Sequence, residues 1–208
     1  MKFPLSEYFS SFQGEGKFTG AYCLFLRFSE CNLRCSFCDT FDRLGKTNHQ
    51  LELEEILDLL KEFGHRRVVI TGGEPLLYPD HLQRLQVALD KLPIVVEVET
   101  NGTLSLKDSL GGMSNWNFNI SPKVWNADAY EQLFRPRKRI YKFPLSPENY
   151  EDTVGFINKF QIDSEEIYVM PLSATKQEYE QRVNFVCEKA IAHKWNFSTR
   201  LQLLHNFE

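Results

Sequence analysis

Residues 22–38 read YCLFLRFSECNLRCSFC, an apolar run that leads directly into three closely spaced cysteines. The run Tyr22–Phe28 is rich in aromatic and aliphatic side chains, which is typical of a β-strand. Cys31, Cys35 and Cys38 then follow within eight residues. Three thiolates on one short loop can bind three irons of a cubane iron–sulfur cluster and leave the fourth iron open. The stretch therefore predicts a strand that ends in a reactive cofactor site.

Further apolar, β-branched and aromatic runs recur along the chain and predict the other strands. These runs are Arg67–Thr71, Ile94–Glu99, Asn117–Ile120, Ile140–Phe143, Glu166–Met170 and Phe197–Leu203. Apolar residues at helical spacing predict helices over residues 53–63, 82–92 and 176–194. Because strands that alternate with helices require right-handed crossovers, the sequence predicts an α/β fold. Its mainly parallel sheet is either open or curled into a full or partial barrel.

Polar, turn-forming segments stand at the carboxyl ends of five predicted strands. They are the cysteine loop, Thr71–Pro75, Thr100–Thr103, Ser121–Lys123 and Pro171–Ser173. Ligands of parallel α/β folds bind at these ends, so we expect the five segments to form one mouth. The sequence shows no internal repeat, low-complexity tract or linker, which predicts a single domain over residues 1–208.

The charge and hydropathy of the chain exclude several classes of partner. The formal net charge is −4 and the isoelectric point is near 5.8. Without a global basic field we expect no nucleic-acid or membrane partner, although a local basic patch stays possible. Pro4 and Glu7 stand where a signal peptide would be apolar, and no run approaches the roughly 20 apolar residues of a membrane span. We expect a soluble, cytoplasmic protein.

The two cysteines outside the triplet are predicted to be buried thiols. Cys23 lies in an apolar run and Cys187 in a helical pattern. An odd total of five, with three in one loop, does not suit a disulfide framework and indicates a reducing compartment. A structural zinc or iron site completed by a histidine is an alternative for the triplet. It is disfavoured because the loop has no histidine at ligand spacing and the chain has no second CxxC.

The triplet, with Phe37 before its last cysteine, resembles the signature of the radical S-adenosylmethionine superfamily. The resemblance implies a partial or modified (β/α) barrel and a [4Fe–4S] cluster whose open iron chelates the amino and carboxylate groups of S-adenosylmethionine. One electron from the cluster then releases a 5′-deoxyadenosyl radical. The turn Gly72-Gly73-Glu74-Pro75 resembles the family's turn for the methionine amino group. Two glycines let a backbone approach a ligand without a Cβ clash.

The superfamily resemblance also implies which residues line the S-adenosylmethionine site. Asp39 is expected either to orient the cluster loop or to lie near the nucleoside, and Ser-Pro-Lys alone could equally be a plain turn. The full expected set is Phe37, Asp39, Gly73, Glu74, Ser121, Pro122, Lys123, Met170 and Pro171.

Four further segments resemble the 7-carboxy-7-deazaguanine synthase family. They are Ser11–Gly16, Arg27, Asp39-Thr40 and Glu99–Thr103. The resemblance implies that a 6-carboxytetrahydropterin loses hydrogen at C6, contracts its ring and releases ammonia. The product is 7-carboxy-7-deazaguanine, on the route to queuosine and related deazapurines.

The candidate substrate and metal residues make chemical sense for such a ligand. Arg27 follows Cys23 and Phe25 on one strand face, so its guanidinium needs an anion: a substrate carboxylate, or alternatively Glu15 or another acid. The amide of Gln13 and the carboxylate of Glu15 can form hydrogen bonds with the donors and acceptors along a pterin edge. The resemblance implies that the Thr40 hydroxyl binds Mg²⁺, whereas alone it suggests a turn residue. The expected substrate set is Phe12, Gln13, Gly14, Glu15, Arg27, Thr71 and Glu208.

Gln202 departs from the family, because several relatives have a histidine at this position near the substrate. The family resemblance also implies an external electron donor, such as flavodoxin or ferredoxin, and a homodimer. Two other functions stay open from the sequence. A glycyl-radical activase would use the same triplet on a partner protein, and a non-enzymatic cluster or zinc protein would not cleave S-adenosylmethionine.

Overall fold

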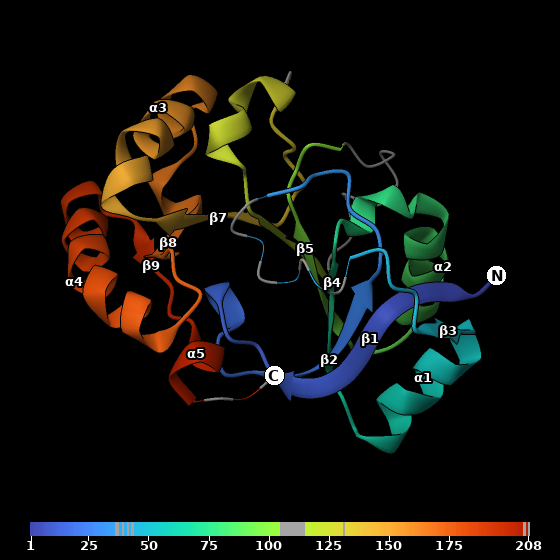
Figure 1. Ribbon diagram of the computed structural model, residues 1–208. Coiled ribbons are helices and arrows are strands. Elements are labelled where there is room, and N and C mark those ends of the chain that lie inside the picture. Colours follow the sequence, from blue (N-terminus) through green and yellow to red (C-terminus); the bar gives the residue numbers. More distant parts are fainter. Residues whose placement is uncertain are drawn as a thin grey trace.

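The computed structural model describes residues 1–35, 38, 40, 42, 44–104, 115–130, 132–205 and 207. Its described part contains one sheet with strand order β3-β1-β2-β4-β5-β6-β7-β8-β9. Strands β2 and β4 to β9 run parallel to one another, while β1 is antiparallel to both β2 and β3. Helices α1 and α2 lie near the β1–β4 end of the curved sheet, and α3 and α4 lie near its β7–β9 end (Figure 1). The mainly parallel α/β fold is therefore confirmed.

The strands are β1 (Phe3–Phe12), β2 (Tyr22–Phe28), β3 (His49–Leu51), β4 (Arg67–Gly72), β5 (Val95–Thr100), β6 (Trp116–Ile120), β7 (Arg139–Leu145), β8 (Ile167–Pro171) and β9 (Asn196–Phe197). The α-helices are α1 (Leu53–Glu62), α2 (Pro79–Leu89), α3 (Tyr150–Phe160), α4 (Lys176–His193) and α5 (Leu201–His205).

The predicted strand over Phe197–Leu203 is wrong. Only Asn196–Phe197 pairs with β8, and Leu201–His205 forms helix α5. An apolar run this short does not separate strand from helix. Beyond the sheet edge, the Leu201 amide donates to the Gly14 carbonyl at 3.0 Å, a contact about 190 positions back along the chain.

The two faces of each strand lie in different surroundings. On β2, Leu24, Leu26 and Phe28 are fully buried in the apolar core with residues of α1 and α2. The alternate residues Phe25 and Arg27 line a cavity on the other face of the sheet. Since side chains alternate along a strand, one face of each strand stabilises the fold while the other is available for a site.

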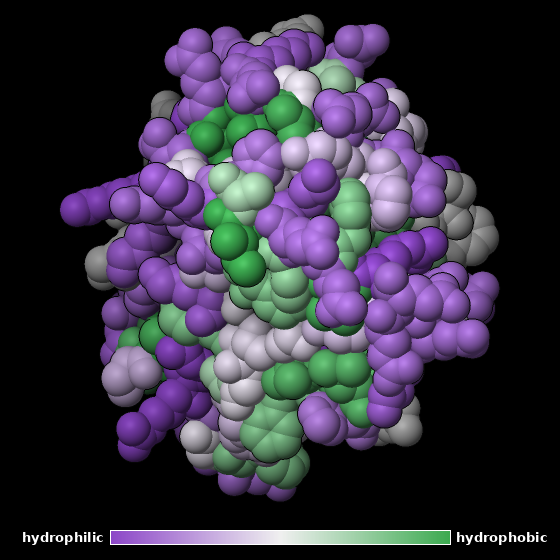
Figure 2. Space-filling view, turned by 90° about the vertical axis from the view of Figure 1, so that its left-hand side faces the viewer, coloured by the Kyte–Doolittle hydropathy of each residue, from purple (hydrophilic) through white to green (hydrophobic). Residues whose placement is uncertain are grey.

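The outer surface over α3 and α4 is largely hydrophilic, with smaller groups of hydrophobic residues between (Figure 2). Among the helices of the described residues, none is long and apolar enough to cross a membrane.

Candidate active site

A cavity of about 630 Å³ opens at the carboxyl ends of the parallel strands. All five predicted strand-end segments contribute to it, as expected from the sequence. Its lining from these segments includes Cys31, Cys35 and Cys38, then Thr71, Gly72 and Gly73, then Thr100 and Asn101, then Ser121 and Lys123, and finally Leu172 and Ser173. The curvature of the sheet thus brings together side chains that lie up to about 140 positions apart in the sequence.

The three cysteines of the triplet face this cavity from one loop. Burial raises the pKa of the Cys31 and Cys35 thiols, and Lys123 opposes that effect at Cys35. Among the described residues, no three His, Cys, Asp or Glu side chains converge on a single point. Because each cysteine of a cubane site binds a different iron, a cluster does not require such convergence. The donor set fits a three-cysteine cluster site with an open iron.

The glycine pair after β4 is needed where the cysteine loop crosses it. Gly72 has φ +137°, and a Cβ on Gly73 would lie 2.2 Å from the Glu30 carbonyl oxygen and 2.7 Å from Cys31 Cβ. The Glu74 amide donates to the Glu30 carbonyl at 2.7 Å. The glycines therefore allow contact with the cysteine loop itself, in addition to the ligand approach expected from the sequence.

The Glu74 carboxylate lies beneath the cavity surface. It accepts hydrogen bonds from Thr100 Oγ1 at 2.7 Å and from the Asn101 amide at 2.7 Å. Burial raises its pKa, and these donors oppose the shift. Gly72 and Gly73 line the cavity but the Glu74 side chain does not, so this carboxylate connects the β4 and β5 turns.

Asn101 also ties the β5 turn to the cysteine loop. Its Nδ2 donates to Asn32 Oδ1 at 2.9 Å, and its backbone carbonyl accepts the Tyr130 hydroxyl at 2.8 Å. Tyr130 in turn accepts the Lys123 amide at 2.9 Å. These bonds connect the loops after β2, β5 and β6 into one polar frame around the mouth.

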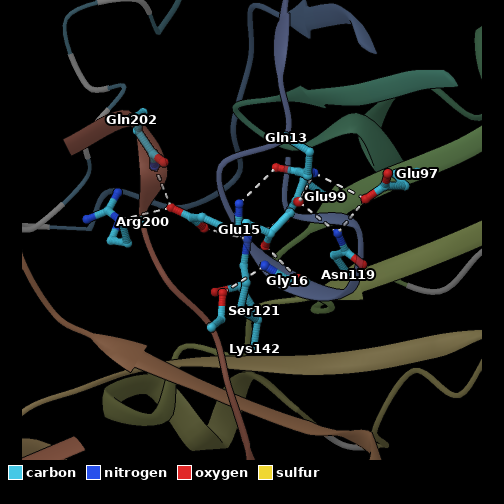
Figure 3. Close-up of polar contacts among 12 residues, drawn as sticks. Gln13, Glu15, Gly16, Glu97, Glu99, Asn119, Ser121, Lys142, Arg200 and Gln202 are labelled. Carbon is cyan, nitrogen blue, oxygen red and sulfur yellow. Dashed lines mark hydrogen bonds and ion pairs between the residues drawn. The ribbon is translucent and has the colours of Figure 1, made fainter. Parts of the chain in front are cut away.

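The opposite end of the cavity is closed by the loop between β1 and β2. This loop enters at the amino end of β2, whereas the cysteines follow its carboxyl end. Gln13, Glu15, Glu99 and Lys142 line the cavity here, and we call these four residues the cavity floor (Figure 3). Ligands bound at the cysteines and at the floor would therefore face each other across the cavity.

Glu15 is held in the floor as a carboxylate. Its Oε2 accepts Lys142 Nζ at 2.8 Å, and its Oε1 accepts Arg200 Nε at 2.9 Å and Gln202 Nε2 at 2.8 Å (Figure 3). Burial alone would raise the pKa of Glu15, but Lys142 and Arg200 outweigh it and hold the pKa at about 2. Both oxygens of the predicted substrate residue are thus already hydrogen-bonded within the protein.

Lys142 connects two strands of the floor. Besides Glu15 it donates to Glu99 Oε2 at 2.8 Å. Burial would lower the pKa of Lys142, but the two carboxylates raise it. Lys142 is not among the residues expected from the sequence, although a single lysine inside the apolar run Ile140–Phe143 is a usable signal of a buried partner.

Arg27 pairs with an acid other than Glu15. Its Nε donates to Glu7 Oε1 at 2.5 Å, and its guanidinium lies 5.9 Å from the Phe9 ring centre. The structural ion pair that the sequence left open is present, with Glu7 on β1 as the acid. Arg27 also lines the cavity.

The C-terminal segment contacts the cavity floor, although Gln202 stands where several relatives have a histidine. Gln202 lines the cavity, and a Cβ on Gly14 would lie 2.0 Å from its Oε1. The Gly14 carbonyl accepts the Leu201 amide. Arg200, for which no sequence signal exists, also donates to the Ser173 carbonyl.

The other predicted residues divide into three groups. Phe12, Thr40, Thr71 and Met170 line the same cavity, with Phe12 half exposed. Pro122 lines a neighbouring cavity of about 570 Å³, and Pro171 lines neither. Phe37, Asp39 and Glu208 lie outside the described residues. Cys23 is buried as expected, whereas Cys187 is only partly buried.

Comparison with known proteins identifies the class. A family model described as "Radical SAM superfamily" matches residues 26–186. The chain therefore belongs to the radical S-adenosylmethionine superfamily. It is 33% identical to a 7-carboxy-7-deazaguanine synthase of Hyperthermus butylicus, over 95% of this chain and 90% of that relative. Within the superfamily it belongs to the 7-carboxy-7-deazaguanine synthase family.

Other relatives agree over most of the chain. A 7-carboxy-7-deazaguanine synthase of Clostridium acetobutylicum is 31% identical over 83% of this chain and 82% of that relative. The crystal structure of QueE from Escherichia coli superposes with a TM-score of 0.72 at 26% identity, over 95% of this chain and 93% of that one. The superposition supports the partial-barrel architecture of the superfamily.

Proposed function

We propose that this protein converts 6-carboxy-5,6,7,8-tetrahydropterin into 7-carboxy-7-deazaguanine, with ring contraction and loss of ammonia. The observation that carries the proposal is one cavity with the cysteine triplet at its mouth and the hydrogen-bonding cavity floor opposite. A flat heterocycle rich in donors and acceptors suits such a floor. The near full-length similarity to 7-carboxy-7-deazaguanine synthases supports the same reaction.

The residues at the mouth fit the two cofactors of the superfamily. Cys31, Cys35 and Cys38 would hold a [4Fe–4S] cluster. The backbone around Gly73, together with Ser121, Lys123 and Met170, would hold S-adenosylmethionine. When bound, these cofactors supply a carbon-centred radical that removes a hydrogen atom from the substrate.

Arg27 would bind the substrate carboxylate. A guanidinium has five N–H donors, so an ion pair to Glu7 through Nε is compatible with a second anion. Thr40 lines the same cavity and lies 3.4 Å from Cys38 Sγ through its hydroxyl. A Mg²⁺ ion bound by this hydroxyl and by the substrate carboxylate would suit the preference of the ion for oxygen ligands.

An anaerobic assay tests the proposal. Cluster-loaded protein with reductant, S-adenosylmethionine, Mg²⁺ and 6-carboxytetrahydropterin is expected to form a product with deazapurine absorbance, and omission of Mg²⁺ is expected to lower the yield. If S-adenosylmethionine is cleaved while the pterin is recovered unchanged, the substrate assignment is wrong and the superfamily assignment stands.

The remaining expectations are also proposals. A flavodoxin or ferredoxin is the chemical class of donor that supplies single low-potential electrons. A homodimer and a cytoplasmic location stay predictions from the family resemblance and the sequence. A glycyl-radical activase, the alternative function, would leave the hydrogen-bonding groups of the floor without a role.

A further inference from the structure

Two amides and two carboxylates form a closed hydrogen-bonded ring at and below the cavity floor (Figure 3). Gln13 Nε2 donates to Glu97 Oε2 at 3.1 Å and to Glu99 Oε1 at 3.4 Å. Asn119 Nδ2 donates to the same two oxygens, at 3.2 and 2.8 Å. The ring joins the β1–β2 loop to strands β5 and β6.

The ring determines what Gln13 can offer to a ligand. Both hydrogens of its Nε2 point to carboxylates, so no N–H is left for the cavity. Its Oε1 accepts the Glu15 amide at 3.3 Å and has a second lone pair. Gln13 can therefore act only as a hydrogen-bond acceptor towards a bound molecule.

Glu97, like Asn119, is a member of the ring that does not itself line the cavity. It is fully buried, and its Oε1 has no hydrogen-bond partner in the described part of the chain. The nearest cation is Arg67, whose NH1 is 3.9 Å from that oxygen and is also without a hydrogen bond among the described residues. A buried carboxylate this poorly compensated is costly for stability alone, which points to a role elsewhere.

We propose that Glu97 is a positioning residue for the substrate: through the Gln13 amide it keeps the cavity floor an acceptor for a ring N–H of the pterin. The inference rests on the proposed function. A tetrahydropterin edge alternates N–H donors with carbonyl and ring-nitrogen acceptors. An acceptor fixed at Gln13 accepts a hydrogen bond from the pterin when an N–H of the pterin faces it. When the pterin is shifted by one group, one of its own acceptors faces Gln13 and the two repel each other.

The test is substrate binding to cluster-loaded Glu97→Leu protein under anaerobic conditions. Without its carboxylate partner the Gln13 amide can turn, so the Kd for 6-carboxytetrahydropterin is expected to rise about tenfold or more. The Kd for S-adenosylmethionine and the bound iron are expected to stay within about twofold, because both sites lie at the mouth. Glu166→Leu is the matched control, because it removes a carboxylate that is paired with Arg139 away from the cavity. It is expected to change neither Kd.

A swap of the two partners covers the case in which Glu97→Leu does not fold. Gln13→Glu would set a third carboxylate against Glu97 and Glu99 and weaken pterin binding. Adding Glu97→Gln to this variant restores an N–H donor between positions 13 and 97. The double variant is expected to bind the pterin about tenfold more tightly than Gln13→Glu alone. An unchanged pterin Kd in Glu97→Leu, a parallel loss of S-adenosylmethionine binding, or no recovery in the double variant would overturn the inference. If the unmodified protein does not bind the pterin, the proposed function itself fails.

Discussion

Glu15 shows how much of a residue's role depends on its partners. The sequence predicts that the Glu15 carboxylate forms hydrogen bonds with the substrate. In the structure this carboxylate accepts hydrogen bonds from Lys142, Arg200 and Gln202. Lys142 lies on β7, Gln202 on α5, and Arg200 in the segment between β9 and α5. The carboxylate therefore anchors the β1–β2 loop inside the barrel, and Gln13 is left with an acceptor oxygen for a ligand.

Lys142→Met is expected to lower the free energy of unfolding by about 3 kcal/mol. The substitution leaves partly buried Glu99 and one oxygen of buried Glu15 without their cation. Chemical denaturation measures the change. Lys61→Met is the control, since its pair with Asp58 is exposed and is worth less than about 1 kcal/mol. A loss for Lys142→Met as small as that of the control would contradict the structural role.

At the scale of elements, the strands and their terminal loops have separate tasks. Alternate residues of each strand pack against helices or line the cavity, while the loops at the carboxyl ends carry the residues proposed to hold the cofactors. The loops are also packed against one another. The contact between the cysteine loop and the turn after β4 is close enough that only glycine fits at position 73.

Gly73→Ala is expected to displace the cysteine loop and reduce the iron retained after reconstitution by at least about half. The added Cβ would overlap the Glu30 carbonyl oxygen and Cys31 Cβ. Iron content and the cluster absorbance measure the effect. Gly155→Ala on α3 is the matched control: its Cβ meets nothing within 4 Å, and it should retain iron and gain up to about 1 kcal/mol of stability. Equal iron in both variants would argue against the contact.

At the scale of the whole molecule, two buried acids respond to pH in opposite directions. The pKa of Glu15 is held at about 2, so its stabilising effect is present above about pH 4.5 and is lost as the pH falls towards 2. Burial raises the pKa of Glu97 to about 7, with Glu99 adding to the shift and Gln13, Asn119 and Arg67 opposing it. The folded state therefore binds the Glu97 proton more tightly than the unfolded chain.

Glu97→Gln is expected to be more stabilising, relative to the unmodified protein, at pH 8 than at pH 5. The cost of ionising buried Glu97 grows as the pH rises from about 4.5 through 7, to about 3 kcal/mol at most. Denaturant unfolding at both pH values measures the difference. Glu166→Gln, in an ion pair with Arg139, should show no such growth. A stability difference for Glu97→Gln that is equal at both pH values would contradict the raised pKa.

The sequence by itself predicted much of this protein. The run Tyr22–Phe28, the spacing of the triplet and five polar strand ends were enough for a mainly parallel α/β fold with one mouth, and the strand over Tyr22–Phe28 has the predicted bounds. These features are local, because strand periodicity and ligand spacing depend on residues that are close together in the sequence. The sequence patterns do not predict β1, β3 or α3, and they predict a strand for the α5 segment.

Only the tertiary structure decided how the cavity floor is built. Glu15 meets Lys142 and Arg200 across separations of 127 and 185 residues, and Glu97 meets Gln13 across 84. No periodicity encodes such contacts, because they arise when the curved sheet brings its inward faces together. Burial then sets the energies of these groups: the same side-chain type has a lowered pKa at Glu15 and a raised one at Glu97, according to which cations and amides the fold places beside it.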